Sequence, residues 1–372
     1  MPILICIFKF SMRFLYAIFK LFPVNNNRII FLSRQASSPS IDFKLLESEL
    51  IDRSDKLNIV FICKRLEKNA LSTLGFGIAV IKSMYFIATS KVCVLESYWP
   101  AISMLNHKES LKVIQIWHSM GKIKKSGFQT IDKAAGRDMR TARLMNMHEN
   151  YDLIIAGGSA WNPFYCTSFN TTAEKLYNVG LPRRDYLMTC EQDIKERIYE
   201  QHPKLQQKPV VLYAPTFRKS ISDKWKGLIT SIDLNKFNLI IKGHPNQKIS
   251  YAEESIFRCD EFTGYELLAV CDYLITDYSA IAVEAALLER KTLYFVYDYE
   301  EYKLRNGLNI HLYDEMPGLV FKNAGALVNY MENERYNMEA LLNYKNKFLP
   351  NVTEKSTVLI TNKIMEYMES KL

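Results

Sequence analysis

Residues 271–302 read CDYLITDYSAIAVEAALLERKTLYFVYDYEEY, and this stretch decides the fold class of the chain. It holds two short apolar runs separated by a segment of helical length, Ala280–Glu289. A strand, a helix and a second strand in this order form a βαβ unit, whose parallel sheet is buried on both faces. Asp277 and Ser279 fall where the helix would begin, a position that serves either as an anion site or simply as a helix cap.

The same alternation of apolar runs and helix-length segments extends through most of the chain. The runs predicted as strands are 29–32, 59–62, 92–95, 113–117, 153–156, 210–213, 239–241, 274–275 and 293–296. A chain of 372 residues is long enough for two domains with separate cores. We predict an α/β protein with an N-terminal amphipathic helix over 1–24, two domains with parallel sheets over 25–190 and 205–350, and a C-terminal helix over 351–372 that crosses back.

The charge balance restricts the class of partner. The chain has 48 Lys and Arg against 40 Asp and Glu, a net charge of +8. This modest excess suits phosphate or an anionic membrane surface, but it is too small to indicate a nucleic-acid-binding protein. The seven cysteines are odd in number and form no C-x-x-C motif, which favours reduced thiols.

The N-terminal segment 3–22 is the most hydrophobic stretch, and Lys9, Arg13 and Lys20 interrupt it. At about 100° per residue these cations fall within roughly 40° of one another, opposite a broad apolar surface. The pattern is typical of a helix that lies in a membrane interface. A core helix with snorkelling cations, or a helix that contacts a partner protein, would show the same pattern.

A first candidate site follows the strand predicted at 113–117. Here the sequence QIWHSMGK places His118 at a strand end, followed by Gly121 and Lys122. Such a histidine can act as a general base or donate to phosphate, and it can equally be a structural residue bonded to the backbone.

Three further loops follow strands of the second half. They carry Thr216 with Arg218, Lys242 with His244, and Asp277 with Ser279; Glu284 lies five residues after Ser279. The ends of parallel strands are where open α/β sheets bind ligands, so these loops predict a nucleotide site. Ordinary turn and cap chemistry is the alternative for each loop taken singly.

These motifs together resemble the CDP-glycerol glycerophosphotransferase family of wall teichoic acid synthesis, which includes primases and polymerases. The resemblance extends from about Arg28 to the C-terminus. Its motifs are WHSMGK (117–122), GLPRRDYL (180–187), YAPTFR (213–218), KGHP (242–245), residues 276–302 and Met316-Pro-Gly318. Ser119-Met120 departs from the Gly-Thr that usually follows the histidine in the family.

The resemblance implies a glycosyltransferase-B-like architecture, with two Rossmann-like domains facing each other across a cleft. It places the acceptor on the first domain, the CDP-polyol on the second, and the protein peripherally on the cytoplasmic face of the cell membrane. His118 and His244 match the family's two essential histidines. The positions assigned to donor binding are Thr216, Arg218, Lys242, Asp277, Ser279 and Glu284, and those assigned to the acceptor or phosphate side are Lys122 and Arg183.

The reaction implied by the resemblance is transfer of glycerol phosphate from CDP-glycerol to a hydroxyl of a lipid-linked or polymeric acceptor, with release of CMP. We predict no cofactor and no metal site. The alternatives are a CDP-ribitol or other polyol phosphotransferase of capsule synthesis, and a nucleotide-sugar glycosyltransferase of the same fold. A non-enzymatic membrane-surface protein would leave the strand-end loops without a purpose.

Overall fold

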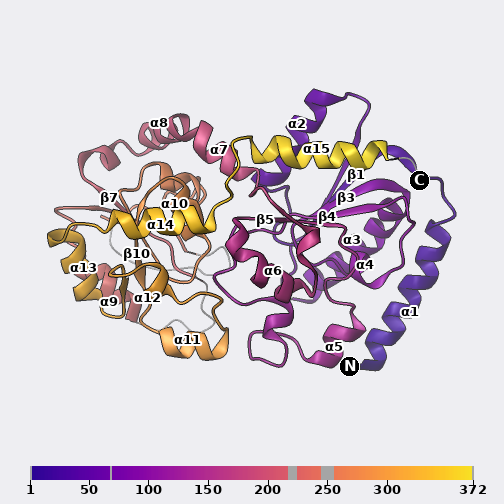
Figure 1. Ribbon diagram of the computed structural model, residues 1–372, viewed down its shortest axis with the longest axis horizontal. Helices are drawn as coiled ribbons and strands as arrows, with labels where there is room; N and C mark the ends of the chain where they lie inside the picture. Colours follow the sequence, from indigo (N-terminus) through magenta and orange to yellow (C-terminus); the bar gives the residue numbers. More distant parts are fainter. Residues whose placement is uncertain (1, 68, 217–223, 244–254, 371–372) are drawn as a thin grey trace. The chain divides into compact units, whose positions relative to one another are not determined.

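The computed structural model describes residues 2–67, 69–216, 224–243 and 255–370 (Figure 1). The chain forms two units, each built on its own parallel sheet, and the predicted fold class is confirmed. The first unit comprises Met1–Met120, Lys125–Asp185 and Pro350–Leu372, and the second comprises Gly121–Lys124 and Tyr186–Leu349. The main chain thus passes between the units after Asp185.

The first sheet has six parallel strands in the order β2-β1-β3-β4-β5-β6. They are β1 (Asn25–Ser33), β2 (Asn58–Cys63), β3 (Ser90–Leu95), β4 (Lys112–Gln115), β5 (Leu153–Ala156) and β6 (Leu176–Asn178). The five runs predicted as strands here are confirmed, and the short edge strand β6 is additional. β3 is buried at every position, as expected for an inner strand of a parallel sheet.

Helices surround this sheet, and polar caps fix where several of them begin. They are α1 (Pro2–Phe19), α2 (Ile41–Arg53), α3 (Ala70–Thr89), α4 (Pro100–Met104), α5 (Met139–Leu144), α6 (Asn162–Phe169) and α15 (Ser356–Glu369). The Ser40 side chain accepts from Phe43 N at the start of α2, and Asn69 accepts from Ser72 N at the start of α3. The C-terminal helix α15 packs on α2 and β3.

The second sheet has five parallel strands in the order β11-β10-β9-β7-β8. They are β7 (Val210–Tyr213), β8 (Asn238–Ile241), β9 (Tyr273–Thr276), β10 (Lys291–Phe295) and β11 (Val320–Phe321). Its helices are α8 (Glu191–Gln201), α9 (Lys224–Ser231), α10 (Ile281–Leu287), α11 (Tyr299–Arg305), α12 (Leu312–Glu315), α13 (Ala324–Asn333) and α14 (Met338–Phe348), and α7 (Arg183–Thr189) spans the passage between units. β9, α10 and β10 form the predicted βαβ unit, with Leu293 in register with Ile275.

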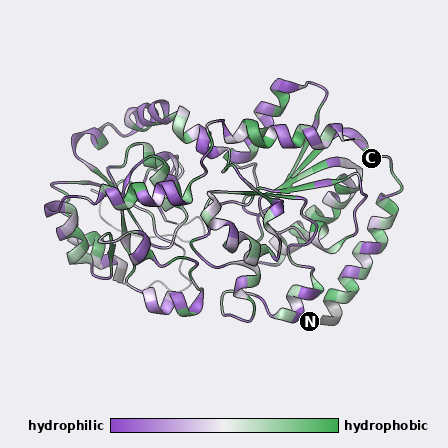
Figure 2. Cartoon of the chain, in the orientation of Figure 1, coloured by the Kyte–Doolittle hydropathy of each residue, from purple (hydrophilic) through white to green (hydrophobic). Residues whose placement is uncertain are grey.

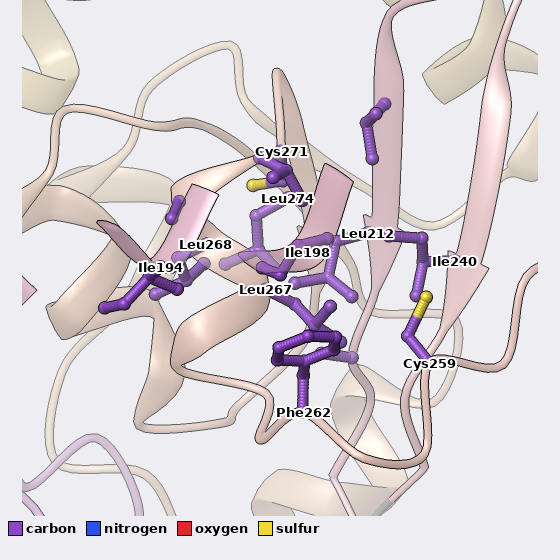
Figure 3. Close-up of a cluster of buried hydrophobic side chains, with 14 of the residues drawn as sticks. Ile194, Ile198, Leu212, Ile240, Cys259, Phe262, Leu267, Leu268, Cys271 and Leu274 are labelled. Atoms are coloured by element: carbon purple, nitrogen blue, oxygen red, sulfur yellow. The ribbon is translucent and has the colours of Figure 1, made fainter. Parts of the chain in front are cut away.

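A cluster of apolar side chains fixes α8 to this second sheet (Figure 3). Ile194 and Ile198 of α8 are fully buried, as are Leu212 of β7 and Leu274 of β9. Burying one such side chain contributes about 1.5–3 kcal/mol to stability. The cluster therefore holds the amino-terminal helix of the second unit on the strands whose ends carry the predicted donor residues.

The N-terminal helix α1 has one buried and one exposed face, and it packs against α3 in the first unit. Met12 and Tyr16 are buried, and the Tyr16 hydroxyl lies 2.8 Å from His107 Nδ1. Apolar side chains spaced three or four residues apart are exposed on the other face. They are Ile7, Phe10, Phe14 and Ile18. Figure 2 shows hydrophobic residues along most of α1, with hydrophilic residues among them.

The cations of α1 are not gathered on that exposed face. Lys9 Nζ donates to Leu144 O and Asn146 Oδ1 at 3.1 and 2.8 Å, and Lys20 Nζ donates to Asn106 O at 3.3 Å. Lys9 and Lys20 thus bond to oxygens of the protein itself, and the place of this segment in a membrane interface stays a prediction.

Helix α3 meets the length and hydropathy of a membrane span, although six of its residues, from Val80 to Thr89, are buried within the first unit. It also carries an exposed apolar stripe. The stripe consists of Leu71, Leu74, Ile78 and Ile81.

Candidate active site

The carboxyl ends of β1, β3 and β4 place a polar cluster at one edge of the first sheet. These strands are neighbours in the sheet, and His118 follows β4 by three residues. Trp117, directly before it, has φ +58°, which is uncommon for a bulky side chain. Such strain costs about 1–3 kcal/mol and persists where the surroundings fix the conformation. The Gln115 side chain accepts from Trp117 N at 2.8 Å and holds this turn.

The His118 imidazole is oriented through Nδ1. This nitrogen lies 3.1 Å from the backbone oxygen of Glu96 and 3.1 Å from the side-chain amide of Gln35. A carbonyl oxygen can only accept a hydrogen bond, so the contact with Glu96 O requires a proton on His118 Nδ1. Rotating the Gln35 side-chain amide by 180° places its oxygen where it accepts from the same N–H. Nε2 is then the basic nitrogen of the neutral ring, the arrangement that a general base needs.

The side chain of Glu96 fixes the backbone that orients His118. Glu96 is 2% exposed, and its carboxyl accepts hydrogen bonds from the hydroxyls of Ser33 and Ser40. Burial raises the pKa of Glu96, and the two serine hydroxyls oppose that shift. Glu96 and Ser33 are not among the predicted site residues, although each directly follows a predicted strand.

The segment that follows His118 is held in place by close contacts. The Tyr165 hydroxyl donates to Ser119 O at 2.9 Å. Gly157 leaves no room for a side chain, because a Cβ there would lie 2.1 Å from Met120 O. Lys122 is 2% exposed, burial lowers its pKa well below the ordinary value, and its segment Gly121–Lys124 belongs to the second unit. Its predicted place on the acceptor side of the first domain stays a prediction.

The GLPRRD motif contributes structural bonds within the first unit. Arg183 is 5% exposed and forms an ion pair of 2.7 Å with Asp42, whose carboxylate also accepts from Arg183 N at 2.8 Å. The Asp185 carboxylate accepts from the backbone N–H groups of Ser356 and Thr357 at 2.9 and 2.7 Å, and so caps α15. These bonds give the motif a structural role, while the contact of Arg183 with phosphate stays a prediction.

In the second unit, Asp277 joins two strand-end loops. Its carboxylate accepts from Thr216 N at 2.9 and 3.1 Å and from Tyr278 N at 2.6 Å. Thr216 and Asp277 are both buried, at 6% and 3% exposure. The Tyr278 ring stacks on Tyr302 with centroids 4.0 Å apart. The structure thus brings Thr216 and Asp277 together, as the predicted donor site requires.

Of the other predicted donor residues, the structure describes Lys242, Ser279 and Glu284. Lys242 directly follows β8, and its ammonium donates to Cys259 O at 3.0 Å. Ser279 is half-buried just before α10, and Glu284 within that helix has no exposed surface. Arg218 and His244 lie outside the described residues. Within the described residues, no group of three His, Cys, Asp or Glu side chains is arranged to hold a metal ion.

Comparison with known proteins identifies the family. The model described as CDP-Glycerol:Poly(glycerophosphate) glycerophosphotransferase matches residues 14–366. The chain belongs to this family. It is therefore an enzyme of the CDP-polyol phosphotransferase class, and the predicted family membership is confirmed.

Relatives in this glycerophosphotransferase family act on different polyols. The chain is 26% identical to the teichoic acid poly(ribitol-phosphate) polymerase of Bacillus spizizenii over 95% of its own length and 58% of the polymerase. It is 28% identical to the teichoic acid glycerol-phosphate primase of Bacillus subtilis over 68% of each chain. A solved structure of the wall teichoic acid polymerase TagF soaked with CDPG has a TM-score of 0.77 at 19% identity, covering 97% of this chain and 94% of that one. This likeness extends the fold match to both units.

Proposed function

We propose that the protein transfers a polyol phosphate from a CDP-polyol to a hydroxyl of a polymeric or lipid-linked acceptor, and releases CMP. The observation that carries the proposal is the orientation of His118, whose Nδ1 faces Glu96 O at a sheet edge in a chain matched to the family over residues 14–366. Glycerol is the polyol that the family description names, and ribitol is the second candidate because a relative polymerises ribitol phosphate.

The proposed reaction is a displacement at phosphorus. The acceptor oxygen forms a bond to the β-phosphorus, the bond from that phosphorus to the bridging oxygen breaks, and CMP leaves with the electron pair. His118 Nε2 takes the proton of the acceptor hydroxyl. Positioning and neutralisation of charge account for most of the catalysis in such transfers. Arg218 and His244, assigned from the sequence, would neutralise the pyrophosphate.

Release of CMP from a panel of donors tests this function. We expect the protein, given a synthetic glycerol phosphate oligomer as acceptor, to release CMP from CDP-glycerol or CDP-ribitol. The donor that is consumed fastest identifies the polyol. Consumption of a UDP-sugar with no release of CMP from either CDP-polyol would refute the proposal in favour of a sugar transferase.

The same proposal includes a peripheral position at the membrane, supported by the exposed apolar stripes of α1 and α3. Phe10 and Phe14 are 72% and 67% exposed and share one face of α1. Lys9 and Lys20 bond to neutral oxygens of the protein and keep their positive charge, so charge and apolar insertion would both attract the protein to an anionic membrane.

We therefore expect the double substitution Phe10→Ser and Phe14→Ser to weaken binding to phosphatidylglycerol vesicles by about tenfold or more, since each phenylalanine is worth on the order of 1.5–3 kcal/mol when buried. Co-sedimentation with vesicles measures the loss. Ile51→Ser is the matched control, because Ile51 is an equally apolar, 55% exposed residue on α2. Equal binding by the double variant and the wild type would exclude α1 as the anchor.

A further inference from the structure

Two arginine side chains of the first unit lie against the same aromatic ring. The guanidinium carbon of Arg34 is 5.7 Å from the centre of the Tyr98 ring, and that of Arg137 is 5.5 Å from it. Both distances are within the range of cation–π attraction. Arg34 directly follows β1, Tyr98 follows β3 by three residues, and Arg137 precedes α5. Three separate segments therefore build the arrangement.

The described part of the chain supplies no carboxylate to either guanidinium within 4.0 Å. The backbone N–H of Arg34 donates to Ser97 Oγ at 3.1 Å, and Arg137 Nη1 lies 2.7 Å from Met145 Sδ, a weak acceptor. Burial and the neighbouring positive charge of Arg137 both lower the pKa of Arg34. Holding two half-buried positive charges close together is unfavourable in free energy unless an anion binds to both of them.

The arginine pair belongs to the same sheet edge as His118. Gln35, the next residue after Arg34, has its side-chain amide 3.1 Å from His118 Nδ1. A chain of ring contacts also connects the two places: Tyr98 to His148 at 5.8 Å, His148 to Trp117 at 6.1 Å, and Trp117 to His118 at 4.2 Å. His148, like Trp117, has a positive φ, at +65°. The aromatic residues between the arginines and His118 are thus fixed in an uncommon backbone conformation.

We propose that Arg34 and Arg137 bind a phosphodiester of the acceptor. The proposal rests on the proposed function. Each transfer leaves a phosphodiester beside the newly added polyol, so the acceptor for the next transfer carries a negative phosphate one polyol away from its reacting hydroxyl. A guanidinium presents a planar fork of donors that matches phosphate oxygens. The pair would therefore select an acceptor that already carries a polyol phosphate and position its hydroxyl for His118.

Steady-state kinetics with two acceptors test this site. Hydrogen bonds to charged groups predict that the double substitution Arg34→Gln and Arg137→Gln raises the KM for a glycerol phosphate oligomer by about tenfold to 100-fold. The KM for the CDP-polyol, and the rate with uncharged glycerol as acceptor, should stay near those of the wild type. Arg140→Gln is the matched control, because it removes an equal charge from an exposed position on α5. An unchanged KM for the oligomer would overturn the proposal.

A binding measurement separates failure of the site from failure of the proposed function. Calorimetric titration of the full chain with the oligomer, without any donor, should show binding that the double variant loses and the Arg140→Gln variant retains. Binding of the oligomer that depends on the two arginines would support the phosphate site even if the protein consumed no CDP-polyol. If the double variant binds the oligomer normally but loses binding to phosphatidylglycerol vesicles, the phosphate belongs to a lipid headgroup and the acceptor assignment is wrong. Arg137→Gln alone, with an unchanged circular dichroism spectrum, gives the same tests should the double variant not fold.

Discussion

Replacing His118 by alanine is expected to lower kcat by about 10²–10⁴-fold, the usual contribution of a general base, while the affinity for the CDP-polyol stays near that of the wild type. The expectation follows from the position of the residue in the first unit, where its Nδ1 faces Glu96 O. The predicted donor residues Thr216 and Asp277 belong to the second unit. Single-turnover kinetics measures the chemical step, and calorimetry measures the donor affinity.

The control for this substitution is His311→Ala, since the His311 side chain is 47% exposed and pairs only with the surface residue Asp314 among the ion pairs of the described residues. It should leave both quantities unchanged. A His118→Ala enzyme that keeps the wild-type kcat would show that the imidazole is a structural residue bonded to Glu96 O. A His118→Ala enzyme that loses affinity for the CDP-polyol but keeps kcat would show that His118 binds the donor and is not the general base.

Most of the fold could be predicted because buried parallel strands leave continuous apolar runs in the sequence. β3, for example, is buried at all six positions and contains the predicted run 92–95. β6 and β11 escaped prediction because both are edge strands of three and two residues with half-buried side chains. Such short, half-buried strands need no apolar run in the sequence, whereas the edge strand β8 is fully buried and was predicted.

The strand-end loops of the site could also be predicted, but the partners of their side chains could not. Asp277 is a predicted donor ligand from its place after a strand, yet in the structure it accepts from the backbone of Thr216, 61 residues away. Arg34 and Arg137 carry no sequence signal of their own, because only the fold brings them to Tyr98. Local sequence patterns thus predict which residues follow the ends of the strands. Which partners their side chains bond to depends on tertiary contacts, which the local patterns do not contain.

The motif that contains Arg183 predicts a phosphate ligand, whereas in the structure its side chain forms an ion pair with the buried Asp42. We expect Arg183→Met to lower the free energy of unfolding by about 3–5 kcal/mol at neutral pH, because it leaves the Asp42 carboxylate buried without its partner. The side chains of the pair are 6% and 1% exposed. Arg183 also lowers the pKa of Glu96, whereas Asp42 raises it, so the substitution leaves two neighbouring acids uncompensated.

The pH dependence of this loss tests its cause. Arg183 is one of the groups that lower the pKa of Glu96, so without it the folded-state pKa of Glu96 should rise further above its unfolded value. The penalty is therefore present where the unfolded acid is ionised and disappears as the pH falls to about 4. Urea denaturation at neutral and acid pH measures it. Arg53→Met, which breaks the exposed pair with Glu49, should cost no more than about 1 kcal/mol. The double variant Asp42→Asn, Arg183→Met should recover part of the loss, because both charges are then gone. A stable Arg183→Met protein with a raised KM for the acceptor would instead make Arg183 the phosphate ligand that its motif predicts.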